Sequence, residues 1–344
     1  MRNGLVIMDL SERRSKGRSK MAISVVIEQY GGPNVFQVKE TPVPAPGPGE
    51  VLIRHMAIGI NFIDVYHRTG LYPLPRLPAV IGSEAAGRIE AVGEGVLSFH
   101  PGERVAYAGG PTGSYCEYRL IDASRLVPVP DSISDRQAAA VMLKGMTAEY
   151  LLRRTYPVKQ GDLILFHSAA GGVGSIACQW AKKLGATVIG TVGNRLKAAI
   201  AEKNGCDYVI LLNEENFPSR VREITGGAGV SVVYDGIGAA TFLPSLECLR
   251  TRGMMVSYGQ SSGVVPPFDI TTLSAKGSLY LTRPSLAHYT ATPEALRSSA
   301  SELFRILSEG VKIEIGQTYP LKEAAKAHVE LEGRKTVGSS LLLP

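Results

Sequence analysis

The sequence has few of the residues that mark a secreted or metal-binding protein. It contains only four cysteines among 344 residues, and none of them forms a Cys-x-x-Cys pair; they are Cys116, Cys178, Cys206 and Cys248. This scarcity is typical of a reducing compartment and argues against a structural zinc site. The six histidines are dispersed as well, so no His-x-x-x-His or His–Cys cluster offers three nearby ligands. We therefore expect no metal.

Long apolar runs and a strong excess of one charge are also absent. No stretch approaches the roughly eighteen uninterrupted apolar residues that a membrane-spanning helix requires. The net charge is +6, but residues 1–20 hold six basic and two acidic residues and so account for +4 of it. The charges of the remaining residues are nearly balanced, and their sequence shows no basic patch that would bind the phosphate backbone of a nucleic acid. We expect a soluble, cytoplasmic protein without membrane or nucleic-acid partners, preceded by a disordered extension at residues 1–20.

The pattern of predicted secondary structure changes part-way along the chain, and the length of the chain is typical of two domains. From residue 21 to about 126, short β-like runs such as 51–60 and 104–107 alternate with glycine and proline turns. Ser134 and Gln137 then form a capping box before a helix over 138–152. Six later β-like runs with helical stretches between most of them predict a doubly wound parallel sheet. They lie at 163–166, 187–190, 208–211, 231–234, 254–258 and 278–281.

A glycine-rich turn follows the first of these six strands. It reads Ser168-Ala-Ala-Gly-Gly-Val-Gly174 and leads into a helix that Gly185 ends. Ala169 takes the first position of the Gly-x-Gly-x-x-Gly pattern. Small residues there let the backbone approach a pyrophosphate at the positive end of the helix. The order strand, turn and helix therefore predicts a dinucleotide-binding unit.

The end of the second strand bears on the choice of cofactor. An NAD enzyme places an acidic residue about twenty positions after the turn, where it binds the ribose hydroxyls. Residues 190–197 contain no acid, and instead carry Arg195 and Lys197. Both side chains can pair with the 2′-phosphate of NADPH. The sequence favours NADPH over NADH; the alternative is that the two residues are solvated charges at the start of a helix.

Several motifs carry a resemblance to a known family. They include Ala57-Ile-Gly-Ile-Asn61-Phe-Ile-Asp64, Gly70-Leu-Tyr72-Pro, Gly82-Ser-Glu84-Ala-Ala-Gly87, Pro101-Gly-Glu-Arg-Val105 and Leu281-Thr-Arg-Pro-Ser-Leu286. With the glycine turn, these runs resemble the zeta-crystallin-like NADPH:quinone oxidoreductases, the zinc-free branch of the medium-chain dehydrogenase/reductase superfamily. The resemblance covers residues 21–344.

The resemblance implies an α/β protein of two domains with the active site between them. Residues 21–145 and 286–344 would form a GroES-like β-barrel catalytic domain, and residues 146–285 a Rossmann dinucleotide-binding domain. Zinc-dependent relatives have a cysteine ligand at the position of Asn61 and a histidine ligand at that of Ser83. Because this chain lacks both, it also lacks the Lewis acid that would polarise an ordinary carbonyl. The enzyme then needs an acceptor that is already activated.

The implied function is the zinc-independent reduction of quinones by NADPH, with one-electron steps to semiquinones as one form of it. An alternative is reduction of α,β-unsaturated carbonyls, because the same pocket could serve an electron-poor double bond. An alternative of another class is a nucleic-acid-binding or crystallin-like structural protein that retains NADPH. The run at 278–281 falls at the expected edge of the nucleotide-domain sheet, so we expect a homodimer.

The resemblance also implies a set of site residues. Asn61 and Tyr66 are the catalytic candidates: each would donate a hydrogen bond to the quinone oxygen, or alternatively only contact the nicotinamide or pack. Leu212 stands where close relatives often have an aromatic residue near the adenine. The implied cofactor-binding residues are Phe62, Ile63, Asp64, Tyr66, Thr147, Tyr150, Gly172, Val173, Gly193, Asn194, Arg195, Lys197, Leu212, Ile237, Tyr258, Gly259, Gln260, Ser261, Pro284, Ser285, Leu286 and Arg334.

Overall fold

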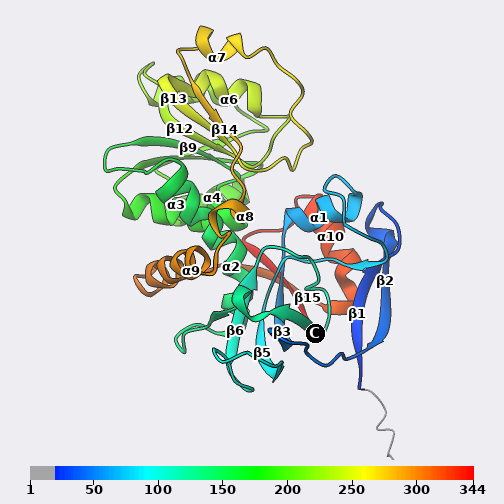
Figure 1. Ribbon diagram of the computed structural model, residues 1–344. Coiled ribbons are helices and arrows are strands. Elements are labelled where there is room, and N and C mark those ends of the chain that lie inside the picture. Colours follow the sequence, from blue (N-terminus) through cyan, green and yellow to red (C-terminus); the bar gives the residue numbers. More distant parts are fainter. Residues whose placement is uncertain (1–19) are drawn as a thin grey trace, which may run out of the picture.

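The computed structural model describes residues 20–344, so all of the extension expected at residues 1–20 except Lys20 lies outside the described residues. The chain forms two lobes (Figure 1). Elements from both ends of the described chain, blue and red in Figure 1, share one lobe, and the middle of the chain forms the other. In residues 20–344, no helix combines the length and the apolar character needed to cross a membrane.

The first lobe is built on two β-sheets. A three-stranded sheet has the order β2-β1-β4, and a larger one has the order β15-β16-β3-β5-β6-β8 with β7 paired to β3. The strands are β1 (Met21–Ile27), β2 (Phe36–Pro42), β3 (Glu50–Ile60), β4 (Ala79–Val80), β5 (Glu84–Val92), β6 (Arg104–Ala108), β7 (Tyr118–Asp122), β8 (Val127–Pro128), β15 (Ile315–Pro320) and β16 (Ser339–Leu343). Helices α1 (Phe62–Thr69) and α10 (Ala324–Glu332) belong to the same lobe (Figure 1).

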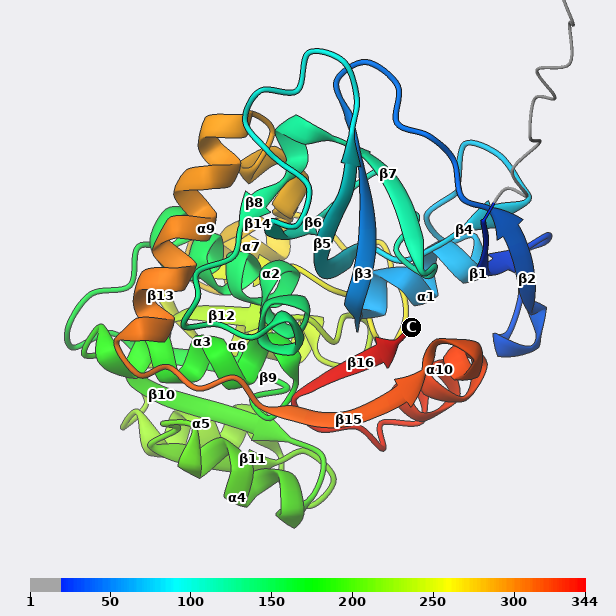
Figure 2. The same cartoon turned by 90° about the horizontal axis from the view of Figure 1, so that it is seen from below.

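The C-terminal strands complete the first lobe. Strand β16 pairs antiparallel with β3, with Leu342 opposite Ile58, and β15 pairs parallel with β16. Figure 2 shows β15 and β16 running beside β3 and α10. Leu342 and Tyr319 lie in the same apolar core as Val51 and Ile53 of β3. Segments separated by more than 200 residues therefore share one hydrophobic core.

The second lobe contains the predicted doubly wound sheet. Six strands lie in the order β11-β10-β9-β12-β13-β14, and every adjacent pair is parallel. They are β9 (Leu163–His167), β10 (Thr187–Val192), β11 (Tyr208–Leu211), β12 (Val230–Asp235), β13 (Leu249–Ser257) and β14 (Tyr280–Thr282). The last strand begins two residues later than expected because Ser278 has a φ of +55°, outside the extended region. The α/β fold class is confirmed.

Helices cover both faces of this sheet, as the alternation of strand residues requires. Ile164 and Phe166 of β9 pack in one core with α3 (Gly172–Lys183) and α4 (Arg195–Lys203). Leu165 between them packs in another core with α5 (Phe217–Ile224) and α6 (Phe242–Cys248). The shorter α7 (Thr271–Ala275) and α8 (Leu286–Tyr289) precede and follow β14.

Helix α2 (Asp135–Tyr150) joins the two lobes. Its start confirms the predicted capping box, since Ser134 Oγ accepts from Gln137 N at 3.2 Å and Gln137 Oε1 accepts from Ser134 N at 3.0 Å. The helix contacts β3, β5 and β16 of the first lobe and α3 and α9 (Pro293–Ser308) on the other side. The division expected between residues 145 and 146 falls inside this helix, and the domain limits stay a prediction.

Candidate active site

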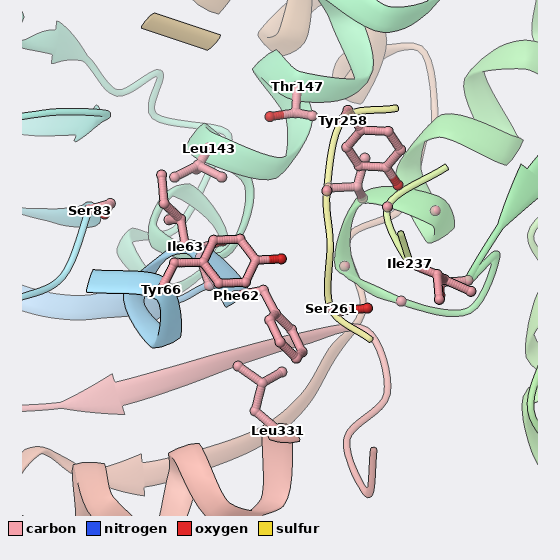
Figure 3. A pocket seen from close by; sticks show the side chains of 18 of the residues that line it. Phe62, Ile63, Tyr66, Ser83, Leu143, Thr147, Ile237, Tyr258, Ser261 and Leu331 are labelled. Carbon is pink, nitrogen blue, oxygen red and sulfur yellow. The ribbon is translucent and has the colours of Figure 1, made fainter. Parts of the chain in front are cut away.

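A cavity of about 1010 Å³ lies between the lobes (Figure 3). Figure 3 shows Phe62, Ile63 and Tyr66 on one side of it, Tyr258 and Ile237 on the other, and Thr147 of α2 between the two. Twenty of the site residues expected from the sequence line it. They are Asn61, Phe62, Ile63, Tyr66, Thr147, Tyr150, Gly172, Val173, Gly193, Asn194, Lys197, Leu212, Ile237, Tyr258, Gly259, Ser261, Pro284, Ser285, Leu286 and Arg334.

Three expected residues, Asp64, Arg195 and Gln260, are not part of the lining. Asp64 is fully buried behind it. Arg195 is largely exposed and pairs with Glu214 at 3.0 Å, so of the two expected cations only Lys197 lines the cavity. Gln260 takes part only through its backbone N–H, which donates to Tyr66 Oη at 3.0 Å.

Further lining residues were missed in the sequence. Ser168 and Gly171 belong to the glycine turn, and their place in that motif was a usable signal. Leu331 and Thr336 come from the C-terminal segment that folds back past the cavity. No local pattern marks these two, because the long-range pairing of β16 with β3 brings them there.

The glycine turn places a helix end against the cavity. Helix α3 begins at Gly172, and residues 171–174 line the cavity. A Cβ on Gly174 would stand 2.3 Å from the carbonyl oxygen of Ser168, so only glycine fits. The first N–H groups of a helix lack intrahelical acceptors and carry partial positive charge. This wall of the cavity is therefore suited to an anionic group such as a pyrophosphate.

A second wall carries two cations. Lys197 and Arg334 both line the cavity, and Lys197 Nζ donates to the Arg334 carbonyl at 2.8 Å. Arg334 has a φ of +56°, a strained backbone state for a non-glycine residue. Burial, and then the charge of Arg334, lower the pKa of Lys197. With Arg283, three cations and no Asp or Glu occur among the described residues of the lining. The cavity thus fits an anionic dinucleotide.

Arg283, at the end of β14, helps to hold the rim of the cavity. Its guanidinium donates to the carbonyl oxygens of Ser257 and Gly259 at 2.9 and 3.0 Å. It also donates to Tyr72 Oη at 3.3 Å. These bonds link the loop after β13 to the first lobe.

Tyr66 is placed as a hydrogen-bond donor to the cavity. Its oxygen accepts the N–H of Gln260 at 3.0 Å, a bond between the lobes, and its ring meets Tyr72 edge-on at 5.1 Å between centroids. Burial raises the pKa of Tyr66 to about 12. The hydroxyl therefore keeps its proton at neutral pH, and can donate it to a group in the cavity because its oxygen is already anchored.

Behind Asn61 lies a buried ion pair. Asn61 Nδ2 donates to Glu84 Oε2 at 2.8 Å, and Lys144 Nζ donates to the same oxygen at 3.0 Å. The N–H of Leu143 satisfies the other carboxylate oxygen at 2.8 Å. Within residues 20–344, no three His, Cys, Asp or Glu side chains are grouped so that they could hold a metal ion. One amide hydrogen of Asn61 is thus committed to Glu84.

Comparison with known proteins agrees with this geometry. Residues 47–131 match the alcohol dehydrogenase GroES-like domain, and residues 172–299 match the zinc-binding dehydrogenase family. A quinone oxidoreductase of Pseudomonas aeruginosa is 50% identical over 325 residues, which cover 94% of this chain and 100% of that protein. The chain belongs to the quinone oxidoreductase family.

Other comparisons extend this membership. The solved structure of the Escherichia coli quinone oxidoreductase complexed with NADPH aligns with a TM-score of 0.92 at 49% identity, covering 94% of this chain and 100% of that one. A 2-haloacrylate reductase of a Burkholderia species is 47% identical over 332 residues, with 94% and 99% covered. This member of the quinone oxidoreductase family is an oxidoreductase with the medium-chain dehydrogenase/reductase architecture.

Proposed function

We propose that this enzyme reduces quinones with NADPH and does so without zinc. The observation that carries the proposal is the cavity lining, which combines a helix N-terminus at a glycine turn with three cations and no described carboxylate. NADPH would supply a hydride from its nicotinamide when bound. The first turn of α3 would hold its pyrophosphate, and Lys197 and Arg334 its 2′-phosphate.

The protein's own residues would then position the acceptor. Phe62 and Ile63 give the first-lobe side of the cavity an apolar surface, and Tyr66 beside them supplies a hydroxyl (Figure 3). A planar quinone suits this surface, because its ring needs apolar contact and its oxygen needs one donor. A quinone accepts a hydride without help from a Lewis acid, so the absence of zinc ligands at Asn61 and Ser83 is compatible with this chemistry.

A second acceptor class is favoured by the comparisons. The relative named 2-haloacrylate reductase acts, by its name, on a conjugated acid, which supports reduction of conjugated double bonds as the alternative. Steady-state oxidation of NADPH with one quinone and one enone separates the two. A larger kcat/KM with the enone would make conjugated double bonds the preferred acceptors and quinones the secondary ones. Spin-trap measurements in the same assay would show whether quinones are reduced in one-electron steps.

Tyr66→Phe tests the placement of the acceptor. We expect kcat with a quinone to fall about two- to tenfold, because a neutral hydrogen bond contributes roughly 0.5–1.5 kcal/mol. The dissociation constant of NADPH should change much less. Stopped-flow turnover and fluorescence titration of NADPH measure the two quantities. Equal losses in both would assign Tyr66 to cofactor binding alone.

Zinc independence has a direct test. We expect full activity after prolonged chelation and dialysis, with far less than one zinc per chain by elemental analysis. The zinc-ligand positions hold Asn61 and Ser83, which are poor zinc ligands compared with thiolate and imidazole. One tightly bound zinc per chain, with activity lost on its removal, would contradict the proposal.

We further propose a homodimer formed through the edge of the second-lobe sheet. Strand β14 ends the six-stranded order, and Tyr280 and Leu281 on it are exposed apolar residues. An edge strand with exposed apolar side chains invites pairing with a second copy. Analytical ultracentrifugation should give a mass near twice 36.7 kDa, and a Tyr280→Lys/Leu281→Lys variant should be monomeric. A monomeric wild type would refute the dimer.

A further inference from the structure

A buried polar network lies directly behind the cavity wall formed by Asn61 and Ser83. Asp64 on α1 is fully buried and accepts three hydrogen bonds. Its Oδ2 accepts from the Asn61 N–H at 2.9 Å and from Tyr115 Oη at 3.2 Å. Its Oδ1 accepts from Ser83 Oγ at 2.9 Å. Of these donors, Ser83 is the hydroxyl that also lines the cavity.

The direction of each bond in this network follows from Arg68. A guanidinium can only donate, so Arg68 donates to His328 Nδ1 at 3.0 Å. Burial lowers the pKa of His328 to about 3, so the ring is neutral and carries its hydrogen on Nε2. That hydrogen is donated to Tyr115 Oη at 2.9 Å, which leaves the tyrosine's own proton for Asp64. Glu332 holds Arg68 in place by accepting two hydrogen bonds, from Nη1 to Oε1 at 2.7 Å and from Nη2 to Oε2 at 2.9 Å.

This directionality decides which oxygen of Asp64 can carry a proton. Two donors already occupy Oδ2, so a proton on the carboxyl must sit on Oδ1 and point at Ser83 Oγ. When Asp64 is ionised, the Ser83 hydroxyl points back at it. When Asp64 is protonated, Ser83 accepts from it and turns its own hydrogen toward the cavity. Figure 3 places Ser83 on the same side of the cavity as Ile63 and Tyr66.

We propose that Ser83 is a catalytic residue that delivers a proton to the oxygen of the bound acceptor, and that Asp64 then transfers its own proton to Ser83 Oγ. The inference rests on the proposed function, with a reduced nicotinamide dinucleotide as the co-reactant. An acceptor that has gained a hydride holds two new electrons and one new hydrogen, and bears negative charge on its oxygen. The Ser83 O–H bond breaks as that oxygen is protonated, and the Asp64 O–H bond breaks as Ser83 Oγ is protonated. Asp64 ends as a carboxylate and regains a proton from solvent after the product leaves.

The electrostatic surroundings of Asp64 suit this role. Burial raises its pKa to about 7, although the hydrogen bonds from Asn61 N and Ser83, the positive charge of Lys144 and the hydrogen bond from Tyr115 each lower it. The groups around it come from four other parts of the fold. They are Ser83 and Glu84 at the start of β5, Tyr115 before β7, Lys144 on α2 and His328 on α10, together with Arg68 of its own helix. A carboxyl that titrates near neutrality can both hold and release a proton under working conditions.

The first test needs neither cofactor nor turnover. Infrared difference spectra of the cofactor-free protein, recorded across pH 5 to 9 for wild type and Asp64→Asn, isolate the carbonyl stretch of a protonated Asp64. We expect this band to disappear as pH rises, with a midpoint at about 7. In Tyr115→Phe the midpoint should move to higher pH, because a donor to the carboxylate is lost. No band at pH 5 would overturn the inference.

The second test is the pH profile of quinone reduction. Because the protonated form is the donor, wild-type kcat should fall about tenfold per pH unit above the midpoint. Ser83→Ala and Asp64→Asn should be slower at pH 6 and flat across the same range. Ser24→Ala is the matched control, since Ser24 is another buried serine of the same lobe, bonded to Thr41 at 3.0 Å and outside the cavity lining. It should keep the wild-type profile.

The outcomes separate the inference from the function on which it rests. If Ser83→Ala oxidises NADPH with the wild-type rate and profile, proton delivery by Ser83 is wrong and quinone reduction stands. If Asp64→Asn keeps the wild-type profile, another group titrates and the inference falls in the same way. If no quinone or enone oxidises NADPH in the wild type at any pH, the proposed function is wrong. The inference about proton delivery, which rests on it, is then wrong as well.

Discussion

Replacing Lys197 with alanine is expected to raise the dissociation constant of NADPH about ten- to 150-fold, since a hydrogen bond to a charged group contributes roughly 1.5–3 kcal/mol. The dissociation constant of NADH should hardly change, because NADH lacks the 2′-phosphate. Lys197 already lies in the cavity and is anchored to the Arg334 carbonyl, so its ammonium is positioned before any ligand arrives. Isothermal titration with both cofactors measures the asymmetry.

Arg195→Ala is the control for this prediction. Both cations lie at the start of α4, but the Arg195 side chain is 82% exposed and pairs with Glu214. It should therefore leave NADPH affinity nearly unchanged. An equal loss of NADPH and NADH in Lys197→Ala would show that the side chain stabilises the bridge to Arg334 and does not read the phosphate. A wild type that prefers NADH would refute the proposed cofactor.

Replacing Lys144 with methionine is expected to lower the free energy of unfolding by about 3 to 5 kcal/mol, because it leaves the Glu84 carboxylate buried without its counter-charge. Both partners are almost inaccessible, with side chains 6% and 0% exposed. The double variant Lys144→Met/Glu84→Gln should recover part of the loss, since it removes the unpaired buried charge. Recovery is incomplete because Leu143 N and Asn61 Nδ2 both donate to Glu84, and the single amide oxygen of glutamine takes the place of only one carboxylate oxygen. Calorimetry and urea unfolding give the comparison.

An exposed pair provides the control for Lys144→Met. Lys326 and Glu323 lie 3.3 Å apart with side chains 61% and 46% exposed, and Lys326→Met should change stability by less than about 1 kcal/mol. If Lys144→Met lowers the free energy of unfolding no more than Lys326→Met does, then water or a movement of the lobes stabilises the charge of Glu84 in place of Lys144. The double variant would then show no recovery.

Local patterns in the sequence predicted those parts of the fold whose partners are close along the chain. The capping box of Ser134 and Gln137 and the strand, turn and helix around Gly172 each depend on contacts within a few residues. Short sequence motifs are therefore enough to predict their geometry. The six parallel strands were placed for the same reason, since each is a short β-branched or apolar run. The late start of β14 comes from a single left-handed residue, Ser278, that no propensity shows.

The contacts of the site that escaped prediction join residues far apart in the chain. Lys197 and Arg334 were each expected at the site, but they are 137 positions apart and their hydrogen bond was not predicted. Arg68 and His328, behind the site, are 260 positions apart. The identity of Lys197 as a cavity cation could be read from the absent acid, but its separation from Arg195 depends on Glu214. Asp64 was expected beside the cofactor because the family resemblance implied it. The turn of α1 directs it inward instead, toward Ser83 and Tyr115.

The return of β16 to the first sheet also constrains how this protein can recombine with its relatives. A chimera with a single crossover anywhere in the second lobe would pair β3 from one parent with β16 from the other, and would mix the two parents' residues in one apolar core. Two crossovers, one after α2 and one before α9, would exchange the six-stranded sheet and leave the first-lobe sheets from a single parent. The nucleotide-binding lobe can therefore be exchanged between relatives as one segment, provided that both crossover points are used.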